Sequence, residues 1–178
     1  MREVLPLLRL KIPRKFANGR IGWDHGVFVP LLLINPKADI PVIQLSVMDS
    51  DNPAQHYAMG KALAPLRDSG IAILGSGMPT FHNLRIMFSG GASNEGFRKR
   101  NKEWSDRLTA TVTKENTEEK GKELEGWREW IGAKEAHPIN GVEHFLPLVV
   151  CAGAGGDDKG VGYGDEVMGS EQFTYYWK

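Results

Sequence analysis

The chain has 178 residues, of which 41% are hydrophobic and 25% charged, a composition typical of globular proteins in water. Lysine and arginine together number 22, as do aspartate and glutamate, so no net charge favours nucleic acid or an anionic membrane. Length and composition therefore predict a single domain spanning residues 1–178 and argue against nucleic-acid binding.

The first fifteen residues are basic and faintly resemble an organelle-targeting segment. Pro6 and Pro13 would interrupt an amphipathic helix there, so we expect instead a surface segment that joins an upstream part of the domain. The apolar run of residues 27–34 is too short to cross a bilayer, and it contains Pro30. The sequence therefore predicts no membrane span.

Cys151 is the single cysteine of the sequence and lies in an apolar run. It cannot form a disulfide within the chain, and the lack of cysteine pairs is typical of proteins in a reducing compartment. We therefore expect a buried, inert thiol and a cytoplasmic protein.

A strand–helix–strand pattern follows in the next part of the chain. The segment 40–47 is rich in β-branched and apolar residues, as buried strands are, and 71–74 is a second such run. Between them, Asp51 or Asn52 is suited to cap a helix over residues 53–67. Strands joined through a helix pair in parallel, so the sequence predicts a parallel βαβ unit and an α/β fold.

The segment 75–82 follows the second predicted strand and contains a glycine-rich turn. In open α/β sheets, ligands collect beyond the carboxyl ends of parallel strands, so His82 is a candidate site residue by its position. Gly75 and Gly77 alone are a weak phosphate-binding signal, because glycines also permit tight turns and the spacing does not continue as a dinucleotide fingerprint. A nucleotide-binding interpretation is therefore rejected.

Two amphipathic helices are predicted in a charge-dense region, residues 95–135. Asn94 is suited to cap the first helix, and Asn116 with Glu119 three residues later has the form of a capping box for the second. The charged faces should lie in solvent, and we assign them no chemistry. Apolar side chains recur at near-helical spacing through both segments: Phe97, Trp104, Leu108, Val112, Leu124, Trp127 and Ile131.

The last part of the chain begins with a further predicted helix. Asn140 and Glu143 have capping spacing, His144 falls in the first turn, and Pro147 should bend the helix just beyond it. A glycine-rich loop over residues 153–164 follows. The chain ends with aromatic residues that alternate imperfectly, as in an edge strand: Phe173, Tyr175, Tyr176 and Trp177.

Three histidines, His25, His82 and His144, lie in separate short motifs that also contain glycine or proline. Imidazole has a pKa near neutrality and binds divalent metals, so these residues are candidate proton shuttles and metal ligands. The alternative for each is a structural role in its turn. The two remaining histidines, His56 and His137, are expected to be solvated or capping side chains. The alternative for His137 is that it approaches the site, because it lies close to His144 in the sequence, although the spacing does not require this.

Five strings of residues, in order along the chain, carry a resemblance to a known family. The sequence is similar to the LigB-type class III extradiol dioxygenases, and most of all to the branch that contains 4,5-DOPA extradiol dioxygenase. The strings are Gly22–Leu31, Ala38–Ser46, His56–Leu63, Gly75–Gly77 with His82–Leu84, and Glu143–Leu148.

The resemblance implies an α/β fold with three layers, α/β/α, and a central mixed, largely parallel sheet. It also implies an enzyme that inserts O₂ into a catechol-type aromatic ring, DOPA-like or related, at a nonhaem Fe²⁺ or Zn²⁺. It implies that His25 is the proton donor, that His82 is a base that also approaches the metal, and that His144 is a metal ligand. A catechol must lose a proton to bind a metal, and the oxygenated intermediate needs a proton, which suits two imidazoles of near-neutral pKa.

The family's remaining metal ligands lie in N-terminal motifs, one of the His-Gly-Ser-Pro kind, and this sequence contains neither motif. Open metal sites need about three protein ligands. We therefore expect the N-terminal portion of the family domain to be missing, which would leave the isolated chain without two ligands. The loss would also expose a sheet edge and apolar surface, which predicts aggregation, self-association or dependence on a partner.

Two other functions are weighed against ring opening. The resemblance extends to Memo-like relatives, so a noncatalytic interaction module on the same scaffold is the main alternative. A zinc hydrolase is a poorer match, because the sequence contains no His-Glu-x-x-His string and no conventional nucleophile elbow.

Overall fold

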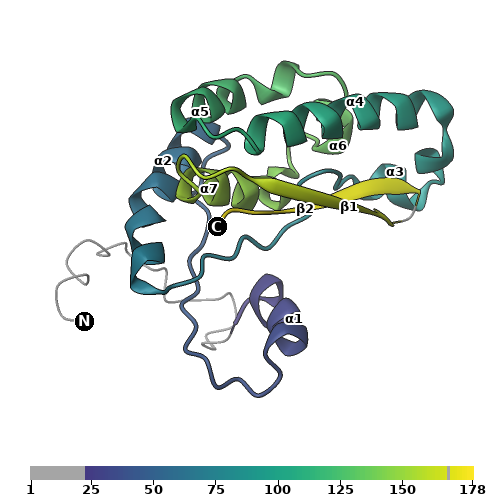
Figure 1. Ribbon diagram of the computed structural model, residues 1–178. Coiled ribbons are helices and arrows are strands. Elements are labelled where there is room, and N and C mark those ends of the chain that lie inside the picture. The colour runs from purple at the N-terminus through teal and green to yellow at the C-terminus, as the bar shows by residue number, and fades with distance from the viewer. Residues whose placement is uncertain (1–22, 168) are drawn as a thin grey trace. The chain divides into compact units, whose positions relative to one another are not determined.

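The computed structural model of the protein describes residues 23–167 and 169–178 (Figure 1). The chain divides into two compact units, one ending at Ser46 and the other running from Val47 to Lys178. The single-domain organisation stays a prediction. The basic segment before residue 16 lies outside the described residues.

In the first unit, the helix α1 (His25–Ile34) begins where Asp24 caps it. A carboxylate oxygen of Asp24 accepts from the backbone N–H of Gly26 at 3.0 Å, and the backbone N–H of Asp24 donates to the Gln44 side chain at 2.9 Å. None of the helix residues is buried, and Leu33 is 83% exposed. This short helix therefore presents most of its apolar surface to solvent.

The second unit contains most of the helices and the sheet. Its α-helices are α2 (Pro53–Leu63), α3 (Leu84–Phe88), α4 (Glu95–Val112), α5 (Thr117–Glu125), α6 (Ala133–Ala136) and α7 (Leu146–Ala154). Its 3₁₀ helices are η1 (Ala64–Ser69), η2 (Gly91–Ser93), η3 (Trp127–Glu129) and η4 (Val142–His144), and its strands are β1 (Val161–Val167) and β2 (Ser170–Tyr176). Among the helices of both described units, none is long and apolar enough to cross a membrane.

The predicted parallel βαβ unit is not formed by the described residues. The segments 40–47 and 71–74 are not strands, and several of their apolar side chains are exposed, Ile43 by 81% and Leu74 by 69%. A β-branched run becomes a strand only where a neighbouring strand supplies hydrogen bonds, and neither segment has such a neighbour within the part of the chain that the structure describes. The sheet observed there is the antiparallel β1–β2 hairpin, in which Val161 lies opposite Tyr176.

The helix predicted over residues 53–67 starts where the sequence predicts, but its last part is a 3₁₀ helix. Asn52 is the cap, because its side-chain oxygen accepts from the backbone N–H of Ala54 at 2.9 Å. The α-helix then tightens into η1, which contains Pro65, and ends at Gly70. Gly70 has φ +75°, a left-handed conformation that glycine adopts without steric cost.

Helices α2 and α7 cross closely because glycines lie at the contact. A Cβ atom at Gly60 would overlap the carbonyl oxygen of Val150, and one at Gly153 would overlap the carbonyl oxygen of Tyr57. α7 is otherwise apolar and mostly buried. Cys151, on the same helix, lies against Gly75, and burial raises the pKa of its thiol to about 11, as expected of an inert thiol.

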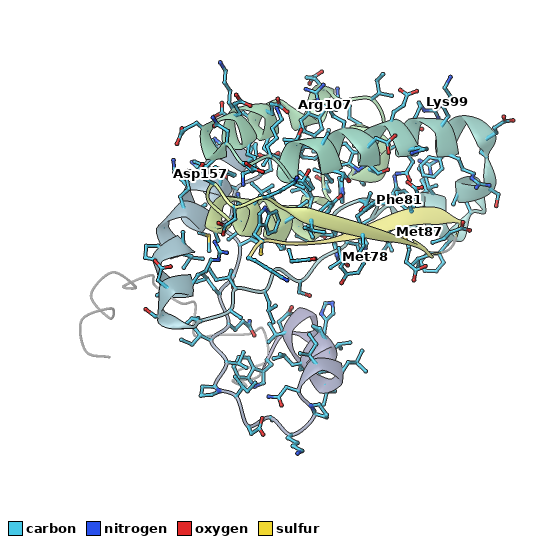
Figure 2. The ribbon with its side chains drawn as sticks, viewed as in Figure 1. Met78, Phe81, Met87, Lys99, Arg107 and Asp157 are labelled. Carbon is cyan, nitrogen blue, oxygen red and sulfur yellow. The ribbon has the colours of Figure 1, made fainter. Side chains whose placement is uncertain are left out.

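The charge-dense helices α4 and α5 begin at the predicted caps. The side chain of Asn94 accepts from the backbone N–H of Phe97, and that of Asn116 accepts from Glu119. Figure 1 shows the β1–β2 hairpin running along α4, and hydrogen bonds join the two, including Thr109 to Tyr175 between their hydroxyl groups at 2.8 Å. In Figure 2, Lys99 and Arg107 lie on the solvent side of α4.

The core of the second unit is built around Trp104. Its ring centroid lies 5.8 Å from that of Trp127, 5.7 Å from Phe145 and 5.9 Å from His137, in tilted or edge-on geometries. Such arrangements suit the charge distribution of aromatic rings. The predicted apolar stripes are therefore core, except that Ile131 is 59% exposed.

The helix predicted to open at Asn140 starts later. Residues 142–144 form η4, which has no side-chain cap, and α7 begins at Leu146. Pro147 therefore lies in the first turn of α7, where its missing N–H leaves no helical bond unmade, and it does not bend the helix as expected. The predicted glycine-rich loop is shorter than 153–164, because β1 already starts at Val161.

Replacing Gly60 with alanine should destabilise the protein by at least about 2 kcal/mol, because the added methyl group overlaps backbone atoms that cannot move independently. The free energy of unfolding in urea measures the effect. Gly126→Ala is the matched control, since its Cβ would meet only the carbonyl oxygen of Glu123 at 3.8 Å. Equal stabilities of the two variants would contradict the close crossing of α2 and α7.

Candidate functional site

His82 and His144 lie together in the second unit. Their rings stack with centroids 3.5 Å apart and an interplanar angle of 22°. His82 ends the segment that follows the glycine turn, and His144 ends η4, so residues far apart in the sequence meet here. Both side chains are partly exposed, so the pair can contact a ligand from solvent.

Backbone hydrogen bonds hold the segments that carry the two histidines. The N–H of Met78 donates to the carbonyl oxygen of His144 at 3.0 Å, and the N–H of His82 donates to that of Ala136 at 3.0 Å. A Cβ atom at Gly77 would overlap the carbonyl oxygen of His144. The glycine turn is therefore required for this approach, which gives the Gly75-x-Gly77 pair a packing role.

Side chains bind the carbonyl groups of the same segment. His137 Nε2 lies 2.7 Å from the carbonyl oxygen of Pro79, and because a carbonyl only accepts, Nε2 carries the proton. The indole N–H of Trp104 donates to the carbonyl of Thr80 at 2.6 Å. The amide of Gln172, on β2, donates to the carbonyl of Phe81 at 2.9 Å, and Figure 2 shows Phe81 close to the hairpin.

Asn83, which directly follows His82, is held in place by the hydrogen bonds of its side chain. Its side-chain oxygen accepts from the backbone N–H of Ile86 and caps α3, while its amide nitrogen donates to the carbonyl of Glu135 at 2.8 Å. The side chain thus uses both ends of its amide group. His82 therefore lies between two anchored residues, so its backbone has little freedom.

Electrostatics favours a neutral ring at His82. Burial lowers the pKa of His82, and the nearby His144 lowers it further, whereas Glu143 acts in the opposite direction. The Glu143 carboxylate lies 3.9 Å from His144 Nε2. At neutral pH a lowered pKa leaves the His82 imidazole able to accept a proton.

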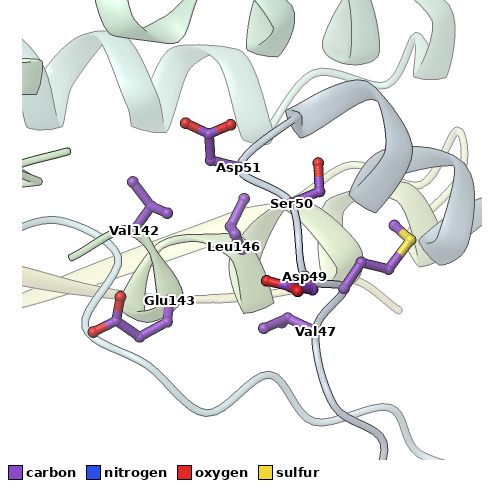
Figure 3. Close-up of a pocket in the computed structure, with 8 residues that line it drawn as sticks. Val47, Asp49, Ser50, Asp51, Val142, Glu143 and Leu146 are labelled. Atoms are coloured by element: carbon purple, nitrogen blue, oxygen red, sulfur yellow. The ribbon is translucent and has the colours of Figure 1, made fainter. Parts of the chain in front are cut away.

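An open hollow of about 260 Å³ lies beside the turn that carries His144 (Figure 3). Three of its lining residues are the carboxylates Asp49, Asp51 and Glu143, which would repel a catecholate anion, so we do not assign the hollow to an aromatic substrate. The full lining comprises Val47, Met48, Asp49, Ser50, Asp51, Val142, Glu143 and Leu146.

His25 lies in the first unit, at the start of α1. Its side chain is 78% exposed, and Nδ1 lies 3.5 Å from a carboxylate oxygen of Asp24. The structure therefore brings two of the three predicted histidines together, and a role for His25 at the same site stays a prediction.

The histidine pair does not by itself fit a metal centre. Within the described parts of both units, no three His, Cys, Asp or Glu side chains gather closely enough to hold an ion. Moreover, the stacked rings of His82 and His144 lie in nearly parallel planes, whereas a metal bound by two imidazoles lies close to the plane of each ring. Fe²⁺ or Zn²⁺ would need the rings to splay and further ligands to join them.

The expectation that His56 and His137 are solvated is wrong, because both are fully buried. His56 Nδ1 lies 2.9 Å from the carbonyl oxygen of Asn52, and Nε2 accepts from the backbone N–H of Met48 at 3.2 Å. His56 thus ties the residues before α2 to that helix. The spacing gave no signal of the burial of His137, since this ring packs against Trp104 and bonds to Pro79, both remote in sequence.

The sequence comparison decides the family. Residues 7–176 match the family described as the catalytic LigB subunit of aromatic ring-opening dioxygenase. The chain belongs to this family.

Several curated relatives of this LigB-family chain carry dioxygenase names. The chain is 48% identical to "Dioxygenase tasH" of Hapsidospora irregularis over 88% of its own length and 49% of that protein's. It is 40% identical to "4,5-DOPA dioxygenase extradiol" of Beta vulgaris over 78% of the chain and 48% of the relative, and 35% identical to the protein so named in Escherichia coli K12 over 80% and 51%. The chain therefore spans about half the length of these relatives.

A solved structure supports the fold class of this LigB-family chain. The crystal structure of an uncharacterised Escherichia coli K12 protein matches with a TM-score of 0.66 and 29% identity, over 88% of the chain and 62% of that protein. Together with the family match, this likeness places the chain in the α/β class.

Stability should depend on pH through His137. Burial lowers its pKa to about 4 from an ordinary value of 6.5, so between these values the unfolded chain binds a proton that the folded chain does not. The unfolding free energy should therefore fall by roughly 3 kcal/mol as the pH drops from above 6.5 to about 4. His137→Gln, which does not titrate, should flatten this part of the profile in urea denaturation. An unchanged slope in the variant would contradict the assignment.

Proposed function

We propose that this LigB-family chain acts in the ring-opening oxygenation of a small catechol-type aromatic, DOPA-like or related, with O₂ as the second substrate. The observation that carries the proposal is the stacked pair of His82 and His144, which the fold assembles from two distant motifs. The family match and the dioxygenase names of the relatives support the same reaction.

In this proposal His82 acts as a base. A catechol hydroxyl must lose a proton before the ring can be oxygenated, and a neutral imidazole in a partly buried position can accept it. Burial and the neighbouring His144 keep His82 neutral, which suits the role. His25 is proposed as the proton donor, and its near-complete exposure leaves it free to meet a ligand.

Fe²⁺ or Zn²⁺ is the proposed cofactor, with His144, and His82 beside it, as the residues of this chain that would face it. Such an ion would supply electrostatic activation of the catecholate. Because the pair alone does not fit an ion, the remaining ligands in this proposal come from outside the described residues. A catechol-type aromatic is the proposed substrate class because curated relatives are named for DOPA.

Oxygen uptake and the visible absorbance of the ring-opened product test the proposal. The chain is assayed with Fe²⁺, O₂ and either L-DOPA or protocatechuate, alone and joined to the half of the Beta vulgaris relative that it does not match. We expect the joined form to turn over. His82→Ala and His144→Ala should each lower its kcat/KM by about 100-fold or more, because proton transfer and ligand binding contribute at least that much.

Lys99→Ala is the control, since this exposed side chain lies on the solvent side of α4 and should leave the rate unchanged. Variants of His82 and His144 that retain the rate of the joined form would refute the roles of the pair. A joined form that binds Fe²⁺ but consumes no oxygen with either catechol would refute the proposed reaction and favour the noncatalytic interaction module.

A further inference from the structure

Three consecutive carbonyl groups before His82 each accept a hydrogen bond from a side chain on a different part of the fold. Pro79 receives it from His137, after α6, Thr80 from Trp104, on α4, and Phe81 from Gln172, on β2. The distances are 2.7, 2.6 and 2.9 Å respectively.

The three hydrogen bonds satisfy carbonyl groups of a segment that is partly buried. The segment 78–83 is neither helix nor strand, yet Thr80 and Phe81 are fully buried. A buried carbonyl without a donor costs free energy comparable to a lost hydrogen bond. Because no strand pairs with this segment within the described chain, its geometry depends on the three side-chain donors.

His137 has a special place among these donors. The adjacent residue, Ala136, accepts from the backbone N–H of His82 at 3.0 Å, while His137 itself donates to Pro79. Residues 136 and 137 therefore hold the segment at both ends, on either side of the two buried residues. Residues 136 and 137 thus fix the position and the orientation of the backbone at His82.

The surroundings of His137 fix the direction of its hydrogen bond. The ring is fully buried, with Trp104, Trp127 and Phe145 within 6.1 Å between ring centroids. Burial lowers its pKa to about 4, so at neutral pH the ring carries one proton, which the contact with the Pro79 carbonyl places on Nε2. At neutral pH the Nε2–H group of His137 is therefore oriented toward the Pro79 carbonyl and able to donate to it.

We propose that His137 is a positioning residue, which through its hydrogen bond to Pro79 holds the His82 ring in its stack with His144. The proposal rests on the proposed function only in taking His82 as a reacting group. It does not place His137 in contact with substrate.

The test measures local opening of the segment by hydrogen exchange, followed by NMR on the full chain. In His137→Leu, which removes the donor, the His82 and Met78 amides should exchange at least about tenfold faster, while those of the α2–α7 crossing are unchanged. Ring-to-ring NOEs between His82 and His144 should weaken. His137→Gln, whose Nε2 is also a donor, should restore both measurements toward wild type.

Two further variants keep the result interpretable. Gln172→Met removes the donor to Phe81 from the partly exposed hairpin, and it should reproduce the faster His82 exchange even if the buried His137→Leu substitution prevents folding. Tyr57→Phe is the matched control, because it removes a hydrogen bond to the Thr117 carbonyl away from this segment. It should leave His82 exchange and the NOEs unchanged.

Equal acceleration of all amides in His137→Leu, or no rescue by His137→Gln, would show a general structural role and overturn the proposal. Both measurements are independent of turnover, so they separate this inference from the proposed reaction. If the joined form is active, His137→Leu should lower kcat more than it raises KM, because it displaces a reacting group and leaves substrate contacts in place. A change confined to KM would also count against the proposal.

Discussion

The indole of Trp104 joins the core of the second unit to its candidate site. One ring packs against Trp127 and Phe145, and its N–H group reaches the buried carbonyl of Thr80 at 2.6 Å. The hydrophobic contacts and the polar contact cannot be varied independently, because both are made by the same rigid ring. The aromatic core therefore determines where the segment before His82 runs.

The sequence predicted most of the elements whose causes are local. The caps Asn52, Asn94 and Asn116 are where the sequence places them, because a cap is decided by a side chain and the two or three residues that follow it. The parallel strands were not formed by the described residues, because pairing depends on a distant neighbour. Extended segments with exposed Ile43 and Leu74 show the same β-branched pattern without its partner.

In the candidate site too, local motifs were informative, whereas contacts between distant residues could not be predicted. The motifs identified His82 and His144 as candidates, and the fold stacks them, but no spacing in the sequence shows that two rings will lie 3.5 Å apart. The contributions of His137 and Gln172 were missed for a related reason, since each acts on a carbonyl more than fifty residues away. Histidine is intermediate in its tendency to be buried, so the residue type does not decide the burial of His137, and only tertiary contacts do.

The single cysteine offers a practical consequence. The sulfur of Cys151 lies against Gly75. Only the thiolate form of a cysteine attacks an alkylating reagent. With a pKa of about 11, this sulfur is almost entirely protonated at neutral pH, so the partly exposed thiol should be alkylated slowly. The rate of alkylation therefore reports any change in the surroundings of this sulfur at the contact between α7 and Gly75, and mass spectrometry can follow it without an introduced probe.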